Sequence, residues 1–418
     1  MKKLHVYLLI CILLLAAFLR FAYIIKDAGR PLKGDEPSYE TIAWNMAIGE
    51  GYQRIDGKGV QSITAMRGPS YVLFLTLIYL IFGRNLLAIY IAQVLLAVGS
   101  GFLLFKICRL LFRRTDVPLV AALMYAIYPP FVTNTQYILT EIFTIFLMLL
   151  AVFGFLNYRM AGKLSWLYVS AVAVAMSTMA KPVLAILPVL FFVAGYARLQ
   201  RRAQVRDLAA QLAVVVLLMV PWTVRNALAF HAFIPTVSVG GIAFWGGTGP
   251  ANGKVVSGLG NPGVPTYVFK AIEGMSEPER DRWFYRDGLR IIRSEPKRYA
   301  ALLMKKKIPC LWFSLAYDAP PTKRNLIFMF CNILVGLTAV LGIVSLKPPR
   351  FAANLLVWLV LYFTVIHVLF FSVFRYSLPV YAYMFCFSAG GVVVVLRRFV
   401  LVDRLLKRLD LGEEAGCP

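Results

Sequence analysis

The sequence contains little that a disulfide framework or a metal centre would need. Its six cysteines are scattered at positions 11, 108, 310, 331, 386 and 417, and four of them fall inside predicted membrane spans. No metal-site spacing emerges, so we interpret them as structural thiols. Two further patterns are missing: the alternating segments of about ten residues that a membrane β-barrel requires, and the internal repeats with paired broken helices that transporters show.

Charged residues make up only 15% of the chain, whereas hydrophobic residues make up 60% and the mean hydropathy is +0.72. Soluble domains are only about 45–50% apolar, so this composition indicates a membrane protein. The sequence supplies many apolar runs of the roughly 20 residues that a spanning helix needs. Because the barrel pattern is missing, we predict an all-α polytopic membrane protein.

Acidic residues are outnumbered, with 20 Asp and Glu against 44 Lys and Arg and a formal net charge of +24. The basic residues lie mainly in short clusters between apolar runs, which indicates membrane topology rather than a nucleic-acid partner. All clusters can be placed on the cytoplasmic side, so we predict cytoplasmic termini in a bacterial inner (cell) membrane. The clusters are residues 2–3, 109–114, 159–163, 198–206, 347–350 and 397–408.

About ten spans are predicted from the apolar runs. The first is interpreted as an uncleaved span, because it exceeds a typical signal-peptide core and lacks a small-residue cleavage site. Residues 70–82 are too short for an ordinary crossing, and leaving them uncrossed places every later basic cluster inside. The predicted spans are residues 4–25, 86–111, 118–132, 137–157, 164–180, 182–198, 208–227, 325–346, 352–373 and 376–397.

This topology divides the chain into four regions. Residues 1–228 form an N-terminal transmembrane module with a first exterior loop at 26–69, and residues 229–324 form a long exterior region. Residues 325–397 are C-terminal transmembrane helices, and residues 398–418 are a cytoplasmic basic tail that suits contact with membrane lipids.

The first exterior loop carries two adjacent carboxylates, Asp35 and Glu36. Pro37 suits the first turn of a helix, where unpaired N–H groups and the helix dipole favour a carboxylate. Asp35 is therefore expected to stay ionised. Tyr39 and Ile42 recur at helical spacing, which predicts an interfacial helix with its apolar face on the membrane. From this stretch alone, Asp35 as a helix N-cap in a solvated loop is an equally good interpretation.

Two parts of the long exterior region have distinct patterns. Residues 240–263 are dense in glycine and predict a flexible exterior loop, which is either a lid over a site or an ordinary linker. Residues 277–298 have the pattern of a soluble amphipathic helix.

Several charged residues fall near the exterior ends of the spans, on one face of the membrane. Each cation has harmless snorkelling as an alternative explanation, but a short carboxylate such as Glu141 cannot snorkel far. Cations with separated carboxylates suit an anionic lipid headgroup that reacts with a nucleophile, because the cations bind phosphate and a carboxylate takes a proton. The set comprises Asp35, Glu36, Arg67, Glu141, Lys181, Arg225 and Arg375.

Over most of its length the chain resembles the GT-C superfamily of integral-membrane glycosyltransferases. The resemblance is strongest to the glycosyltransferase family 39 branch, with the protein O-mannosyltransferases and the lipid A aminoarabinose transferases. Each motif is weak alone, but their order and topology together are fairly specific. The motifs are Gly34-Asp35-Glu36 with Tyr39, Arg67-Gly68-Pro69, Thr140-Glu141, Ala180-Lys181-Pro182, residues 221–226, and Arg375-Tyr376 with Pro379.

The resemblance implies a GT-C-like bundle that transfers a hexosyl or pentosyl group from a polyprenyl-phosphate carrier to an acceptor on the exterior (periplasmic) face. It makes Asp35 the general base of an inverting displacement, with Glu36 as a further catalytic candidate. Glu141 occupies the family's second acidic position, which is often Asp, so its role is positioning or metal binding. The predicted donor-phosphate ligands are Lys181 and Arg375, with Arg67 and Arg225 behind them.

The sequence leaves the metal and the acceptor open. A divalent metal held by Asp35 and Glu141 is not demonstrated, because the carboxylates have no spacing motif. The acceptor could be a lipid, a glycan or a protein, since the chain lacks the sizeable soluble C-terminal domain of some relatives. The competing class is a non-enzymatic transporter or flippase of a lipid-linked or anionic solute, which would also have a basic exterior cleft.

Overall fold

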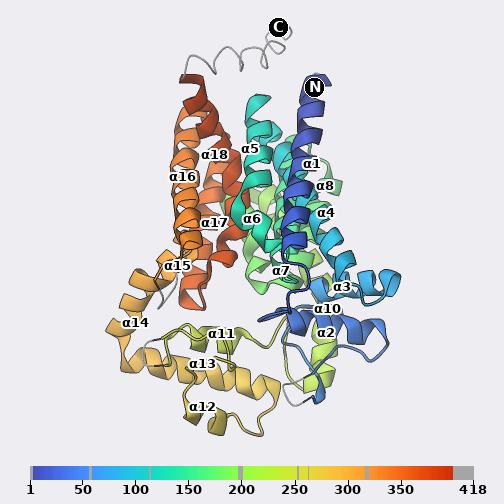
Figure 1. Ribbon diagram of the computed structural model, residues 1–418, viewed down its shortest axis with the longest axis vertical. Helices are drawn as coiled ribbons and strands as arrows, with labels where there is room; N and C mark the ends of the chain where they lie inside the picture. Colours follow the sequence, from blue (N-terminus) through green and yellow to red (C-terminus); the bar gives the residue numbers. More distant parts are fainter. Residues whose placement is uncertain are drawn as a thin grey trace.

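The computed structural model describes residues 3–55, 59–112, 114–195, 201–251, 254–261, 263–315 and 320–398. A long bundle of helices forms most of the protein, and a smaller group of helices projects from one end, which we call the site end (Figure 1). The start of α1 and the end of α18 both lie at the opposite end of the bundle. The prediction of an all-α polytopic membrane fold is confirmed. The predicted basic tail, from residue 399 onward, lies outside the described residues.

Seven described helices are long and apolar enough to cross a membrane, judged by length and composition. Shorter apolar helices stand among them, and each of the predicted spans overlaps a long or a short apolar helix. The long ones are α1 (Lys3–Lys26), α4 (Leu86–Leu111), α7 (Thr140–Ala161), α10 (Arg201–Phe230), α16 (Lys323–Leu346), α17 (Arg350–Leu369) and the segment formed by η4 (Phe374–Ser377) with α18 (Leu378–Arg398). The shorter ones are α3 (Pro69–Phe82), α5 (Asp116–Ile127), α8 (Leu164–Ala180) and η1 (Pro182–Ile186) with α9 (Leu187–Ala194).

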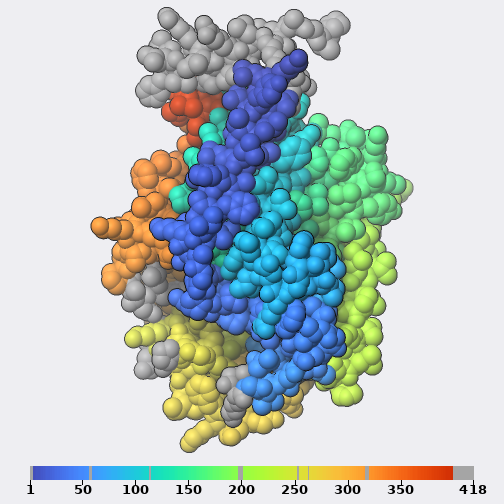
Figure 2. All heavy atoms as spheres, turned by 45° about the vertical axis from the view of Figure 1, so that its right-hand side comes forward, coloured from blue at the N-terminus to red at the C-terminus, as the bar shows by residue number. Residues whose placement is uncertain are grey.

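Burial differs strongly between the long helices. In α7 and in the Phe374–Arg398 segment, 78% of the most apolar window is buried inside the protein, compared with 22% in α1 and 11% in α10. Figure 2 shows α1 lying along the outside of the bundle. The helix α7 and the segment containing α18 therefore form the centre of the bundle, and both begin at the site end.

The helix α3 has 14 residues, which corresponds to about 21 Å at a rise of 1.5 Å per residue. The hydrocarbon core of a bilayer is about 30 Å thick, so a straight helix of this length is shorter than the core. It packs on α2 (Glu36–Ala47) and α8 at the site end. Leu77, Leu80 and Ile81 are exposed on its outer face.

Arg20 lies in the last third of the apolar α1 and is completely buried. Its guanidinium donates to the carbonyl oxygens of Tyr125 and Ala126, both at 3.2 Å. These carbonyls would normally accept from the amides four residues later, but those positions are Pro129 and Pro130, which have no N–H. Arg20 therefore satisfies the acceptors that the Pro-Pro break leaves open between α5 and α6 (Pro129–Asn134).

The first loop, residues 26–69, which is predicted to be exterior, contains α2 followed by a two-stranded antiparallel hairpin, β1 (Gln53–Ile55) and β2 (Gln61–Ile63), with Arg54 paired to Ser62. The helix α2 begins next to Pro37 as predicted. Its apolar residues Tyr39 and Ile42 are buried in a core cluster shared with α3, so this face contacts protein rather than the bilayer surface. The prediction of an apolar face lying on lipid is therefore wrong, because helical spacing alone does not distinguish the two apolar surroundings.

The long region predicted to be exterior, residues 229–324, contains α11 (Gly240–Gly246), α12 (Thr266–Ala271), α13 (Glu277–Ser294), α14 (Pro296–Leu302), η3 (Leu303–Lys307) and α15 (Ile308–Phe313). The predicted amphipathic helix is confirmed as α13, which Ser276 and Glu279 start with a capping box. The prediction of a flexible loop is wrong for residues 240–246, which are helical. Glycine is needed there for close packing, since a Cβ on Gly241 would lie 2.1 Å from the carbonyl oxygen of Asp281.

Candidate functional site

Asp35 occupies the N-cap position of α2, but its side chain makes no capping hydrogen bond. Its Oδ1 accepts from Nη2 of Arg67 at 2.7 Å, and its Oδ2 accepts from Nη2 of Arg375 at 3.0 Å. Burial alone would raise the pKa of Asp35, but the two guanidinium groups outweigh this effect and hold the pKa below its ordinary value. The carboxylate is therefore ionised at neutral pH and is engaged by cations rather than by the helix end.

Local backbone constraints bring the two arginines to Asp35. Arg67 precedes Gly68, where a Cβ would lie 2.0 Å from the carbonyl oxygen of Met179 at the end of α8, so only glycine allows this approach. Ser38 also accepts from Nε of Arg67 at 3.1 Å. Arg375 lies in η4, immediately before α18. The site thus forms where the first loop meets the ends of the central helices.

Glu141 and Lys181 complete a charged cluster around Arg375. Glu141 lies in the first turn of α7, and its Oε1 is 3.5 Å from Nε of Arg375 and 3.6 Å from Nζ of Lys181. Lys181 sits in the break between α8 and η1, where the following Pro182 favours the extended backbone that is observed. One guanidinium therefore bridges the carboxylates of Asp35 and Glu141.

These side chains line a cavity of about 150 Å³ at the site end, which we call the reactive cavity. Three cations and two carboxylates face it, leaving one net positive charge that favours an anion. Within the described residues, neither Nζ of Lys181 nor Oε2 of Glu141 has a hydrogen-bond partner, although both atoms are buried. The lining residues are Asp35, Tyr39, Met66, Arg67, Gly68, Leu139, Thr140, Glu141, Ala180, Lys181, Pro182, Val237, Val239, Arg375 and Tyr376.

Two tyrosines of the cavity were not singled out as site residues from the sequence. The Arg67 guanidinium lies 4.9 Å from the ring centroid of Tyr39, and Nζ of Lys181 lies 4.1 Å from that of Tyr376. Burial raises the pKa of Tyr39 to about 12, so its hydroxyl is neutral. Both rings orient cations through cation–π contacts. In the sequence, both tyrosines stand next to charged residues within the motifs, and this position could have identified them as site residues.

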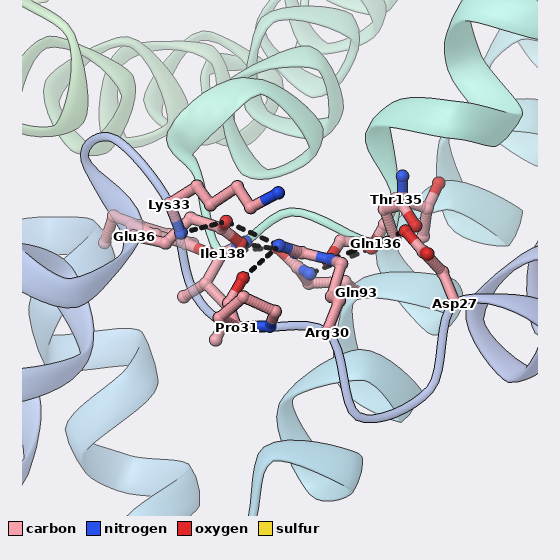
Figure 3. Close-up of polar contacts among 10 residues, drawn as sticks. Asp27, Arg30, Pro31, Lys33, Glu36, Gln93, Thr135, Gln136 and Ile138 are labelled. Carbon is pink, nitrogen blue, oxygen red and sulfur yellow. Dashed lines mark hydrogen bonds and ion pairs between the residues drawn. The ribbon is translucent and has the colours of Figure 1, made fainter.

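Glu36 lies outside the reactive cavity. Its carboxylate accepts from both terminal nitrogens of Arg30, at 2.8 and 2.6 Å, and from the amides of Lys33 at 3.0 Å and Ile138 at 2.9 Å (Figure 3). Arg30 also donates to the carbonyl oxygen of Gln136 at 2.6 Å. This network ties the first loop to the segment before α7. Glu36 is only 1% exposed. It therefore helps to hold the structure of the loop that carries its neighbour Asp35.

Arg225 also lies outside the reactive cavity. Its guanidinium donates to the carbonyl oxygens of Thr64 at 2.8 Å and Tyr52 at 3.1 Å, and it lies 4.9 Å from the ring centroid of Trp222. Arg225 therefore fastens the hairpin region of the first loop to α10. Of the four cations predicted to bind phosphate, the structure brings Arg67, Lys181 and Arg375 together and leaves Arg225 apart.

Among the described residues, no group of three or more His, Cys, Asp or Glu side chains could hold a metal ion. Arg375 contacts both carboxylates of the cavity, Asp35 and Glu141. The charged side chains of the reactive cavity therefore suit an anion. The cations can orient a phosphate, and a carboxylate can accept a proton.

Residues 66–224 match the family model described as dolichyl-phosphate-mannose-protein mannosyltransferase. This match includes Arg67, Glu141 and Lys181, whereas Asp35 and Arg375 lie outside it. No curated protein matched the chain in a sequence search.

Solved structures give the more particular comparison. An oligosaccharyltransferase, AglB, from Archaeoglobus fulgidus, in complex with an inhibitory peptide and a dolichol-phosphate, matches with a TM-score of 0.62 and 16% identity, covering 100% of this chain and 53% of that one. The oligosaccharyltransferase of the same organism, tethered to an acceptor peptide, gives 0.62 and 14%, covering 99% and 52%. ArnT from Cupriavidus metallidurans in the apo state is more distant, with a TM-score of 0.44, 14% identity and coverage of 92% and 77%.

The chain therefore shares the fold of the archaeal oligosaccharyltransferase and matches the mannosyltransferase family model over residues 66–224, in agreement with the GT-C resemblance drawn from its motifs. It spans about half the length of the archaeal proteins that it matches.

Proposed function

We propose that this protein transfers a hexosyl or pentosyl group from a polyprenyl-phosphate carrier to an acceptor at the site end of the bundle. The observation that carries the proposal is the arrangement around Arg375, which contacts Asp35 and Glu141 beside the buried Nζ of Lys181. The archaeal structure of similar fold contains a dolichol-phosphate, which supports a lipid-phosphate carrier as the donor.

In this proposal Arg67, Lys181 and Arg375 bind the donor phosphate. A buried ammonium group without a hydrogen-bond acceptor is costly, and a phosphate oxygen would supply the acceptor that Lys181 lacks among the described residues. Guanidinium groups suit phosphate because they donate two parallel hydrogen bonds. The net positive charge of the reactive cavity favours the same ligand.

Asp35 then acts as the general base. The acceptor hydroxyl oxygen attacks the anomeric carbon, the bond from that carbon to the phosphate oxygen breaks, and the hydroxyl proton passes to Asp35. The phosphate leaves with the bonding electron pair, stabilised by the cations, and direct displacement inverts the anomeric configuration. A bound phosphate partly neutralises the positive charge of Arg67 and Arg375. This weakens their effect on Asp35, so the pKa of Asp35 rises and the carboxylate becomes a stronger base.

Glu141 is a positioning residue in this scheme, because its Oε1 lies beside both Arg375 and Lys181. We assign Glu36 to positioning as well, through its hold on the loop that carries Asp35. The scheme uses Arg67, Lys181 and Arg375 to stabilise the charge of the leaving phosphate, because all three line the reactive cavity. The predicted topology would place this chemistry on the exterior (periplasmic) face, with both termini in the cytoplasm.

The test uses purified protein in nanodiscs with radiolabelled polyprenyl-phosphate sugars and a panel of lipid, glycan and protein acceptors. We expect the labelled sugar to leave the lipid and to be found either on an acceptor or as free sugar after hydrolysis, with inverted anomeric configuration. Labelled lipid that is moved across the bilayer but never cleaved would instead identify a flippase. A Lys181→Ala variant measures the background.

A further inference from the structure

A second and larger cavity lies beside the reactive one at the site end. Its volume is about 590 Å³, and it is bounded by the end of α10, the segment that follows, and the first turns of α13. This volume falls in the range of about 300–1,000 Å³ that is typical of sites for small molecules. None of the donor-binding cations lines it, so it is free for a different ligand. We call it the outer cavity.

The two cavities meet at a thin wall formed by residues 237–239. Val237 lines both cavities, Ser238 lines the outer one, and Val239 lines the reactive one. Glu277 of α13 accepts from the Ser238 hydroxyl of this wall and from Oγ1 of Thr64 at 3.0 Å, which ties the wall to α13 and to the first loop. A molecule in the outer cavity therefore lies next to the space in which Asp35 acts.

The charges of the outer cavity have the opposite sign to those of the reactive cavity. Glu279 and Asp281 face it together with Arg282, which leaves one net negative charge when histidine is neutral. Asp281 is oriented through Oδ1 by the amide of Gly241 at 2.6 Å, and Glu279 through Oε2 by Ser276 at 2.8 Å. Within the described residues, the second oxygen of each carboxylate is left for a ligand. Burial also raises the pKa of Asp281 above its ordinary value, as is common in binding clefts.

Most of the apolar lining consists of aromatic and aliphatic side chains at the end of α10 and in the segment that follows it. Phe233 is 81% exposed and Phe230 lies near it on the lining. An aromatic ring this exposed offers a flat apolar surface to a ligand. The cavity thus combines oriented hydrogen-bond acceptors with an aromatic face.

We propose, on the basis of the function proposed above, that the outer cavity binds the acceptor and that this acceptor is a neutral saccharide. Sugar hydroxyls donate to carboxylate oxygens, and the C–H face of a sugar ring packs on an aromatic ring. The net negative charge disfavours an anionic acceptor. An extended peptide is less well matched, because such ligands pair through their backbone along a sheet edge or lie in an apolar groove.

Conservative variants remove the charges without removing the structural hydrogen bonds. Glu279→Gln preserves the capping box of α13, because glutamine serves in this motif as well as glutamate does. Asp281→Asn keeps an oxygen that accepts from the Gly241 amide. Phe233→Ala removes the exposed ring. The matched control is Glu273→Gln, at an exposed acidic residue that does not line the outer cavity.

The experiment measures transfer and donor hydrolysis together, using the full chain in nanodiscs with a radiolabelled polyprenyl-phosphate sugar. The acceptor probes are neutral oligosaccharides, uronic-acid oligosaccharides of equal length, and a serine-rich peptide. We expect transfer to a neutral oligosaccharide. The acceptor KM should rise about 10- to 100-fold in the double variant Glu279→Gln/Asp281→Asn and rise in Phe233→Ala, with the control unchanged.

Two results would overturn the inference while leaving the proposed function intact. One is hydrolysis of the donor with no transfer to any neutral oligosaccharide, or with preferred transfer to the peptide or to the uronic-acid probe. The other is transfer to the neutral probe that none of the three substitutions affects. Loss of both hydrolysis and transfer with every donor would instead contradict the proposed function itself.

Discussion

The Nη2 atom of Arg375 lies 3.0 Å from Oδ2 of Asp35, although 340 positions separate the two residues in the chain. The same guanidinium approaches Glu141 at the start of α7. One side chain therefore joins the first loop, α7 and the segment containing α18. Because these parts come from the two ends of the chain and its middle, the reactive cavity exists only when the whole bundle has folded.

Lys181→Ala should greatly slow use of the lipid donor. A cation that meets a desolvated phosphate is worth on the order of 2–5 kcal/mol in the transition state, which corresponds to a loss of roughly 30- to 5,000-fold. Arg375→Ala should show a loss of the same order. Single-turnover transfer from a radiolabelled donor measures both effects, and Lys297→Ala, at an exposed lysine of α14, serves as the control. Unchanged turnover in Lys181→Ala and Arg375→Ala would show that the donor phosphate binds elsewhere.

Glu36→Ala should lower stability more than it affects chemistry. It removes the buried partner of Arg30 and leaves the Ile138 and Lys33 amides without their acceptor. Breaking a buried ion pair costs roughly 3–5 kcal/mol, so the melting temperature in detergent should fall clearly. The molecules that stay folded should keep most of their turnover. A loss of turnover at normal stability would instead support the direct catalytic role that the sequence predicted for Glu36.

The pH dependence of stability should reveal the same network. Burial alone would raise the pKa of Glu36, but Arg30 and the two amides outweigh it and lower this pKa below its ordinary value. A lowered folded-state pKa contributes stability that is present above the unfolded-state pKa and is lost as pH falls through the folded-state value. Thermal unfolding should therefore vary little above about pH 5 and weaken steeply below about pH 4. Glu36→Gln should make this acid loss shallower than in the unchanged protein.

Much of the site could be predicted because its charges interrupt strongly apolar helices. Glu141, Lys181 and Arg375 stand out for this reason, and the structure brings them together. Asp35 and Glu36 are different, because neighbours on a helix point about 100° apart and sequence does not tell which one faces the cavity. The sequence also does not tell which cations face the cavity. Arg225 has the same pattern as Arg67, but it donates to backbone carbonyl groups of the first loop instead.

The rest of the fold depended on contacts that local sequence does not encode. The glycines of residues 240–246 suggested flexibility, yet they permit close packing of α11 on α13. Arg20 lies within a predicted span, and its role becomes visible only beside the Pro-Pro break of another helix. In both cases the partner is distant in the chain, so a single stretch of sequence could not reveal it.

Membrane topology can be tested with single cysteines at exposed positions. Glu273→Cys, near the start of α13, should react with an impermeant reagent in intact cells, whereas Arg202→Cys, at the start of α10, should react only after permeabilisation. Gly247 was also predicted to be exterior, but it is unsuitable for labelling, because a Cβ there would lie 1.5 Å from the Phe370 carbonyl oxygen. Labelling of position 202 in intact cells would overturn the predicted arrangement.

Asp35→Asn tests the proposed general base most directly. The side chain makes no capping hydrogen bond, and asparagine caps about as well as aspartate in any case, so α2 should not be destabilised. If Asp35 accepts the hydroxyl proton, transfer should fall by roughly 10²- to 10⁴-fold. The donor KM should stay level or fall, because Arg67 and Arg375 lose a competing carboxylate and remain available to the phosphate. Single-turnover transfer at saturating acceptor and direct donor binding measure the two quantities separately. If asparagine instead weakened donor binding and transfer in parallel, Asp35 would act by placing the arginines, and near-normal transfer would remove it from the mechanism.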